Sequence, residues 1–68
     1  MQGSNRAQPV FFTTKELAKR WRMSHRSLEG WRDKGLGPTY HVIGSSVRYH
    51  IEDIVEFERR STFDGDVE

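Results

Sequence analysis

The side chains in this sequence that could carry chemistry are mostly cations, and they are unevenly distributed. Between Thr13 and His50 there are eight Lys and Arg residues against three acids, a balance of +5. Between Ile51 and Glu68 two arginines stand against seven acids, a balance of −5. A basic first part and an acidic last part are typical of a protein that presents one face to nucleic acid. Two solvated faces without any partner would give the same distribution, so charge alone leaves both interpretations open.

Metal binding and catalysis find little support among the other reactive residues. The chain has no cysteine, and its three histidines lack the spacing of metal ligands; they are His25, His41 and His50. The acids of the last segment fit a solvated helix face better than an acid–base pair; they are Glu52, Asp53 and Glu56. The Gly35–Pro38 stretch is typical of a turn and not of a phosphate-binding loop. We therefore expect no enzymatic activity, no metal site and no cofactor.

Two short helices that carry capping signals are predicted in the basic part. Thr13 and Glu16 form a capping box, which predicts a helix over about residues 14–22. Ser24 is a second N-cap candidate and Gly35 a helix stop, so a second helix is expected over residues 25–34. The apolar positions of the two helices predict their buried faces, with both tryptophans in the core; these positions are Leu17, Ala18, Trp21, Leu28 and Trp31. The second helix has the narrower apolar stripe, which leaves it a wide polar face.

A hairpin and a third helix are predicted in the rest of the chain. Residues 40–43 and 47–50 are rich in β-branched and aromatic side chains, and Gly44–Ser46 supplies the turn between them. The last helix is expected over residues 51–60, with acids in its first turn and arginines in its last. Its apolar side is predicted to comprise Ile51, Ile54, Val55 and Phe57.

Two short helices joined by a tight turn have the plan of a helix-turn-helix, and the second helix has the size and polarity to enter a DNA major groove. Its first backbone N–H groups and the Ser24 hydroxyl would meet a phosphate. The residues expected to face base edges are His25, Arg26, Glu29 and Gly30. The hairpin that follows would act as a wing, whose tip and Arg48 reach the sugar–phosphate backbone or the adjacent minor groove. A helical hairpin with a merely solvated face remains the alternative.

The stretch 12–57 resembles the excisionase-type, MerR-like winged helix-turn-helix proteins of phages and integrative elements. The motifs that carry the resemblance occur in the order and at the spacing of that family; they are Phe-Thr-Thr-Lys-Glu-Leu-Ala at 12–18, Met-Ser-His-Arg-Ser-Leu-Glu-Gly-Trp-Arg at 23–32, Gly-Leu-Gly-Pro at 35–38 and Val-Arg-Tyr-His-Ile-Glu-Asp-Ile at 47–54. By this resemblance Ser24–Gly30 is the recognition segment and Gly44–Arg48 the wing. Many members carry basic residues at the wing tip, where this chain has Ser45 and Ser46.

These observations predict a mainly α-helical fold with a small β-hairpin, a winged helix-turn-helix that binds double-stranded DNA. The expected DNA-contacting residues are Lys15, Arg22, Ser24, His25, Arg26, Ser27, Glu29, Gly30, Ser45, Ser46 and Arg48. The domain is expected over residues 11–60, between a flexible arm (1–10) and a disordered acidic tail (61–68). No segment has the roughly 20 apolar residues of a membrane span, and we expect a cytoplasmic protein without membrane contact.

The resemblance implies an excisionase, a recombination directionality factor that binds and bends DNA beside an attachment site and promotes excision by an integrase of the tyrosine or serine recombinase type. A single module of this size buries roughly 600–1,000 Å² on DNA, so self-association along the duplex is expected. A small transcription regulator of a mobile element is a second interpretation. A protein-interaction module that uses the acidic last helix is a third, from a different class.

Overall fold

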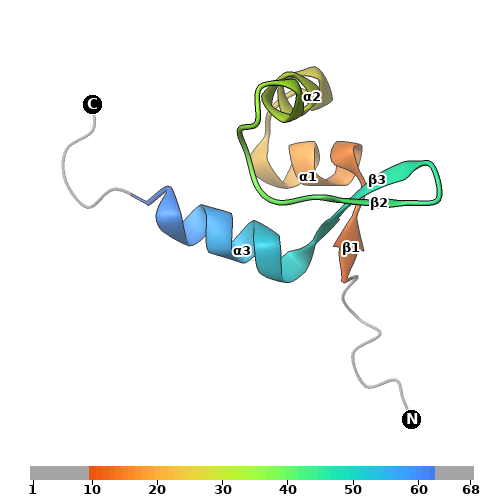
Figure 1. Cartoon of the computed structure of the whole chain (residues 1–68). Helices are drawn as coiled ribbons and strands as arrows, with labels where there is room; N and C mark the ends of the chain where they lie inside the picture. Colours follow the sequence, from red (N-terminus) through yellow and green to blue (C-terminus); the bar gives the residue numbers. More distant parts are fainter. Residues whose placement is uncertain (1–9, 63–68) are drawn as a thin grey trace, which may run out of the picture.

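Three short helices and three short strands occupy residues 10–62, the part of the chain that the computed structural model describes (Figure 1). Their order is β1 (Phe11–Phe12), α1 (Thr14–Trp21), α2 (His25–Asp33), β2 (His41–Ile43), β3 (Ser46–His50) and α3 (Ile51–Arg60). Within this part, three helices and a three-stranded antiparallel sheet form a small α/β arrangement that is compatible with a winged-helix-like one. Most of the predicted arm and tail lies outside the described residues. No helix between residues 10 and 62 is long and apolar enough to cross a membrane.

The beginning of α1 is held by the predicted capping box. The side chain of Thr13 accepts a hydrogen bond from the N–H of Glu16 at 3.0 Å, and the Glu16 carboxylate accepts one from the N–H of Thr13 at 2.9 Å. Both donors are N–H groups at the helix N-terminus, for which the helix itself provides no acceptor. The capping prediction is therefore confirmed, and α1 begins at Thr14 as expected.

The turn between α1 and α2 depends on one residue with an unusual backbone. Arg22 adopts the left-handed conformation (φ 58°), so α1 ends at Trp21, one residue earlier than predicted. A residue other than glycine in this conformation costs roughly 1–2 kcal/mol. The chain reverses there, and Ser24 then caps α2 by accepting from the N–H of Ser27 at 3.2 Å. The second helix ends at Asp33, one residue earlier than predicted, and the expected stop Gly35 (φ 75°) follows its C-cap Lys34.

The sheet has one strand more than the predicted hairpin. β3 is its central strand, and β1 pairs with it through Phe11 opposite His50 and Phe12 opposite Tyr49. A two-residue strand is too short to show alternation, which is why the sequence did not predict it. The predicted turn was one residue too long, because Ser46 pairs with Ile43 and belongs to β3. The turn itself is Gly44–Ser45, and the positive φ of Gly44 (66°) is typical of a two-residue hairpin loop.

The core lies between the sheet, α1, α2 and the first part of α3. Its fully buried members come from every helix and from β3; they are Leu17, Ala18, Leu28, Tyr49 and Ile54. Trp21 and Trp31 are half-buried at the margin of this core, not in its interior as predicted. The prediction for Val55 was wrong, since its side chain is 38% exposed. Ile51 packs against the core as predicted, and Phe57 packs against Trp21 at its margin. Only one side of α3 is buried, and Val55 lies on the other side, in contact with solvent.

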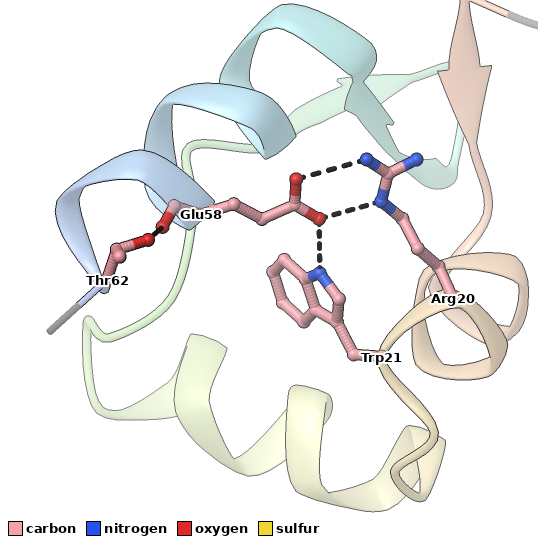
Figure 2. Close-up of polar contacts among 4 residues, drawn as sticks. All are labelled: Arg20, Trp21, Glu58 and Thr62. Atoms are coloured by element: carbon pink, nitrogen blue, oxygen red, sulfur yellow. Dashed lines mark hydrogen bonds and ion pairs between the residues drawn. The ribbon is translucent and has the colours of Figure 1, made fainter. Parts of the chain in front are cut away.

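The carboxylate of Glu58 connects the last turns of α3 to the end of α1 through hydrogen bonds (Figure 2). Glu58 accepts two hydrogen bonds from the guanidinium of Arg20, at 2.7 and 3.0 Å, and a third from the indole N–H of Trp21 at 2.6 Å. The ring of Phe57 lies 5.5 Å from the ring of Trp21, between centroids. The hydrogen bond from Arg20 lowers the pKa of Glu58, and its partial burial opposes this effect. The same hydrogen bond raises the pKa of Arg20.

Replacing this carboxylate is expected to produce a pH-dependent loss of stability. The pKa of the Glu58 carboxyl is lower in the folded state than its ordinary value of 4.5. The ionised carboxylate therefore stabilises the fold fully above pH 4.5, and this stabilisation is lost as the pH falls through the pKa of the folded state. We expect Glu58→Gln to lose about 1 kcal/mol at pH 7, since the ion pair is partly exposed and screened. The melting-temperature gap between Glu58→Gln and the parent should shrink at acidic pH.

Glu56→Gln is the matched control, because Glu56 also forms ion pairs with arginines, Arg59 and Arg60, but on the exposed face of α3. We expect its melting temperature to differ little from that of the parent at either pH. If the melting temperature of Glu58→Gln lay equally far below that of the parent at pH 7 and at pH 3, the charge-based explanation would be contradicted. The loss of stability would then be due to packing.

Candidate nucleic-acid interface

Five of the eleven predicted DNA-contacting residues line one hollow, which we call the interface hollow. Its volume is about 390 Å³, and its walls come from the start of α1, from one face of α2 and from β3. The predicted residues that it brings together are Lys15, His25, Glu29, Ser46 and Arg48, and the remaining lining residues are Thr13, Thr14 and Val47. Residues more than 30 positions apart in the sequence therefore share one surface. All but Val47 present a polar or charged side chain there.

The ion pairs of the described part are all made by acids of α3. Glu58 pairs with Arg20, and Glu56 with both Arg59 and Arg60, while Asp53 lies 3.3 Å from His41 Nε2 and pairs with it when the imidazole is protonated. Among residues 10–62, the other seven Lys and Arg residues form no ion pair; they are Lys15, Lys19, Arg22, Arg26, Arg32, Lys34 and Arg48. The acidic helix therefore does not neutralise the cations of the interface hollow.

The N-terminal end of α2 lies beside this hollow and carries no acid. The first turn of α1 contains Glu16, and that of α3 contains Glu52 and Asp53, whereas the first turn of α2 has none. The partial positive charge at a helix N-terminus favours anions. Ser24 satisfies the N–H of Ser27, and the remaining N–H groups of the first turn are oriented outward at the helix end. The electrostatics of this end are therefore suited to a phosphate.

Arg48 occupies the strand wall of the hollow and is half-buried. Its guanidinium donates to the carbonyl of Val47 at 2.9 Å, so the side chain is folded back along its own strand. His41 is its partner across the hairpin. A guanidinium has five N–H donors, and the one hydrogen bond to Val47 leaves other donors for a ligand.

The other six predicted residues are not part of the hollow's lining. Ser24, Arg26 and Ser27 are exposed in and before the first turn of α2, and Ser45 is exposed in the hairpin turn. Arg22 is exposed in the turn before α2, and Gly30 is half-buried on α2. These residues border the first turn of α2 or the hairpin tip, so a ligand would reach them only if it extended beyond the hollow.

Arg32 is a residue whose role the sequence did not reveal. Its guanidinium donates to the hydroxyl of Tyr49 at 3.1 Å and to that of Thr14 at 3.4 Å, and it lies 5.6 Å from the ring centroid of Tyr40. It therefore links α2 to α1 and to the hairpin side of the fold. No local sequence pattern indicates this role, since its hydrogen-bonding partners are 17 and 18 positions away. Thr13 and Thr14 were also missed as lining residues, although they directly precede and open a predicted helix.

The histidines outside the hollow have separate local roles. His41 Nε2 lies 3.3 Å from the carboxylate of Asp53, and His50 Nδ1 accepts from the N–H of Glu52 at 3.0 Å, which caps α3. Among the described residues, no three His, Asp or Glu side chains form a group that could hold a metal ion. These two histidines are therefore accounted for by the packing of the hairpin against α3.

Comparison of the chain with protein-family models and with curated proteins finds no match.

Gly30→Ala is expected to separate stability from binding. A Cβ at this position would meet no atom within 4 Å, so nothing in the fold itself requires a glycine. Alanine should therefore stabilise α2 by about 0.5–1 kcal/mol. If the bare backbone allows a close approach of DNA, the same change should weaken duplex binding. Thermal melting and fluorescence anisotropy with labelled duplex would measure the two effects. A stabilised Gly30→Ala protein with unchanged affinity would contradict a close approach at this position.

Proposed function

We propose that this protein is a winged helix-turn-helix that binds double-stranded DNA and has no enzymatic activity. In this proposal α2 is the recognition helix, which enters the major groove by its N-terminal end, and the β2–β3 hairpin is the wing. The observation that carries the proposal is the interface hollow, where the start of α1, the polar face of α2 and β3 converge with cations that have no acidic partner in residues 10–62.

The residues of this surface divide into two chemical roles. Lys15 and Arg48, with the backbone N–H groups at the start of α2, are suited to phosphates, which position a protein without reporting sequence. Arg26 and Glu29 are exposed on α2 and are suited to base edges, Arg to guanine and Glu to the amino group of cytosine. The carboxylate of Glu29 would be repelled by the phosphates of the DNA backbone. Its presence among the cations therefore favours a role in recognising the base sequence.

Within this function, we propose an excisionase role in which the chain binds tandem sites beside an attachment site and bends the DNA for an integrase. Two arguments support it: the resemblance over residues 12–57, and the small size of the module, which calls for neighbouring copies on the duplex. A transcription regulator of a mobile element would use the same surface. A protein-interaction role for α3 has less support, because three of its acids are already paired within the chain.

Arg26→Ala and Arg48→Ala are expected to weaken DNA binding in different ways. If Arg26 reads a guanine, its loss should cost about 1–3 kcal/mol on the preferred sequence and relax the preference at one base pair. Loss of Arg48, a phosphate contact, should weaken specific and random duplexes by similar factors and lower the slope of log affinity against log salt by about 0.9. Anisotropy titrations on two duplexes over a salt series would measure both effects.

Arg59→Ala is the matched control, because Arg59 is an exposed arginine of α3 that pairs with Glu56. Its affinity and salt slope should equal those of the parent. Equal losses for Arg26→Ala, Arg48→Ala and Arg59→Ala would indicate non-specific attraction to the whole chain and would contradict the proposed surface.

The excisionase role predicts a reaction that a simple regulator cannot support. With the integrase of the same mobile element and a supercoiled plasmid that carries both attachment sites, addition of the protein should convert substrate to excised circle. Arg26→Ala should lower the yield in proportion to its loss of binding. Tight, specific binding without any stimulation of excision would reject the excisionase role and favour the regulator.

A further inference from the structure

A second hollow of about 310 Å³ lies on a different part of the molecule, where the end of α1, the middle of α2 and the last turn of α3 meet. We call it the aromatic groove. Four apolar side chains line it, Trp21, Met23, Trp31 and Phe57, with Glu58 and Ser61 completing the lining. The three rings lie within 6.4 Å of one another, between centroids. The interface hollow shares no residue with this groove.

The groove offers apolar surface and little hydrogen-bonding capacity. The Glu58 carboxylate is already engaged by Arg20 and by the indole of Trp21 (Figure 2). Two tryptophans at the margin of the core of so small a domain leave apolar area in contact with water, which is unfavourable. An aromatic side chain suits such a site, because rings prefer offset or edge-to-face contacts with other rings.

Two cations lie close in the sequence to residues that line the aromatic groove. Arg22 lies between the lining residues Trp21 and Met23, and Lys34 follows Trp31 by one helical turn. Both are exposed, and neither forms an ion pair within residues 10–62. An occupant that combines an aromatic ring with neighbouring acids would therefore complement the groove with its ring and these two cations with its acids.

We propose that the aromatic groove is the docking site of Phe63, in the segment that follows α3. Ser61, which lines the groove, is only two residues before Phe63, a span of at most about 7 Å. Phe63 is followed by Asp64 and Asp66, the acids that Arg22 and Lys34 would attract. Docking of Phe63 is intramolecular and its tether is short, and burial of a phenylalanine ring favours the docked state by roughly tenfold or more. The inference does not depend on the proposed DNA binding.

Tryptophan fluorescence tests this docking directly, because both tryptophans of the chain line the groove. Phe63→Ser should shift the emission to longer wavelength and increase quenching by acrylamide, whereas Phe63→Leu should preserve most of the protection. Val67→Ser is the matched control, an apolar residue of the same segment that the proposal leaves undocked. Its emission and quenching should equal those of the parent. All variants would be measured as full-length chains.

A dilution series separates this proposal from its alternatives. Protection by Phe63 within one chain is independent of protein concentration. Protection that rises with concentration and persists in Phe63→Ser would show that a second copy covers the groove. Equal quenching of the parent, Phe63→Ser and Val67→Ser at all concentrations would show an uncovered groove. Either of these results would overturn the proposal, as would equal effects of Phe63→Ser and Val67→Ser.

Discussion

The hydrogen bond from Arg32 to the hydroxyl of Tyr49 is the interaction on which the candidate interface depends. Tyr49 is fully buried on β3, the central strand of the sheet, and a buried phenol requires a partner for its hydroxyl. Arg32 supplies it from the last turn of α2 and also contacts Thr14 and Tyr40. The hydrogen bond that satisfies the buried hydroxyl of Tyr49 therefore also connects α2 to the hairpin. Through these contacts one guanidinium connects α1, α2 and β3, the three elements that form the walls of the interface hollow.

The distribution of acids gives this surface its charge. α3 lies on the opposite side of the fold from the tip of the hairpin (Figure 1). Three of its four acids, Asp53, Glu56 and Glu58, contact nearby Arg or His side chains. A near-neutral chain can therefore present a locally basic face, since most acids of the described part lie on α3 and no acid forms an ion pair with Lys15 or Arg48. Glu58 adds a structural role, because its three hydrogen bonds attach α3 to α1. The acidic helix thus stabilises the fold without masking the cations of α2 and β3.

Local signals in the sequence predicted the helices well, and long-range contacts account for what they missed. Caps act within three or four residues, so helix boundaries came within one residue of those observed. Burial depends on neighbours distant in the chain, and the exposure of Val55 and the marginal position of the tryptophans were therefore not foreseen. The same holds for Arg32 and Glu58, whose hydrogen-bonding partners are 17 to 38 positions away. Part of the candidate site could be anticipated because polar positions of α2 and β3 follow from helical and strand periodicity.

The central claim is that duplex DNA is bound by the face formed by α1, α2 and β3, and amide chemical-shift mapping tests it most directly. A ¹⁵N-labelled sample would be titrated with an unlabelled duplex at low salt, which permits binding without knowledge of the target sequence. The account predicts that the largest changes occur at Thr14, Lys15, His25–Gly30 and Ser45–Arg48, and that the outer face of α3 around Glu52 and Glu56 changes little. Changes concentrated on that face of α3, or no changes at any residue, would contradict it.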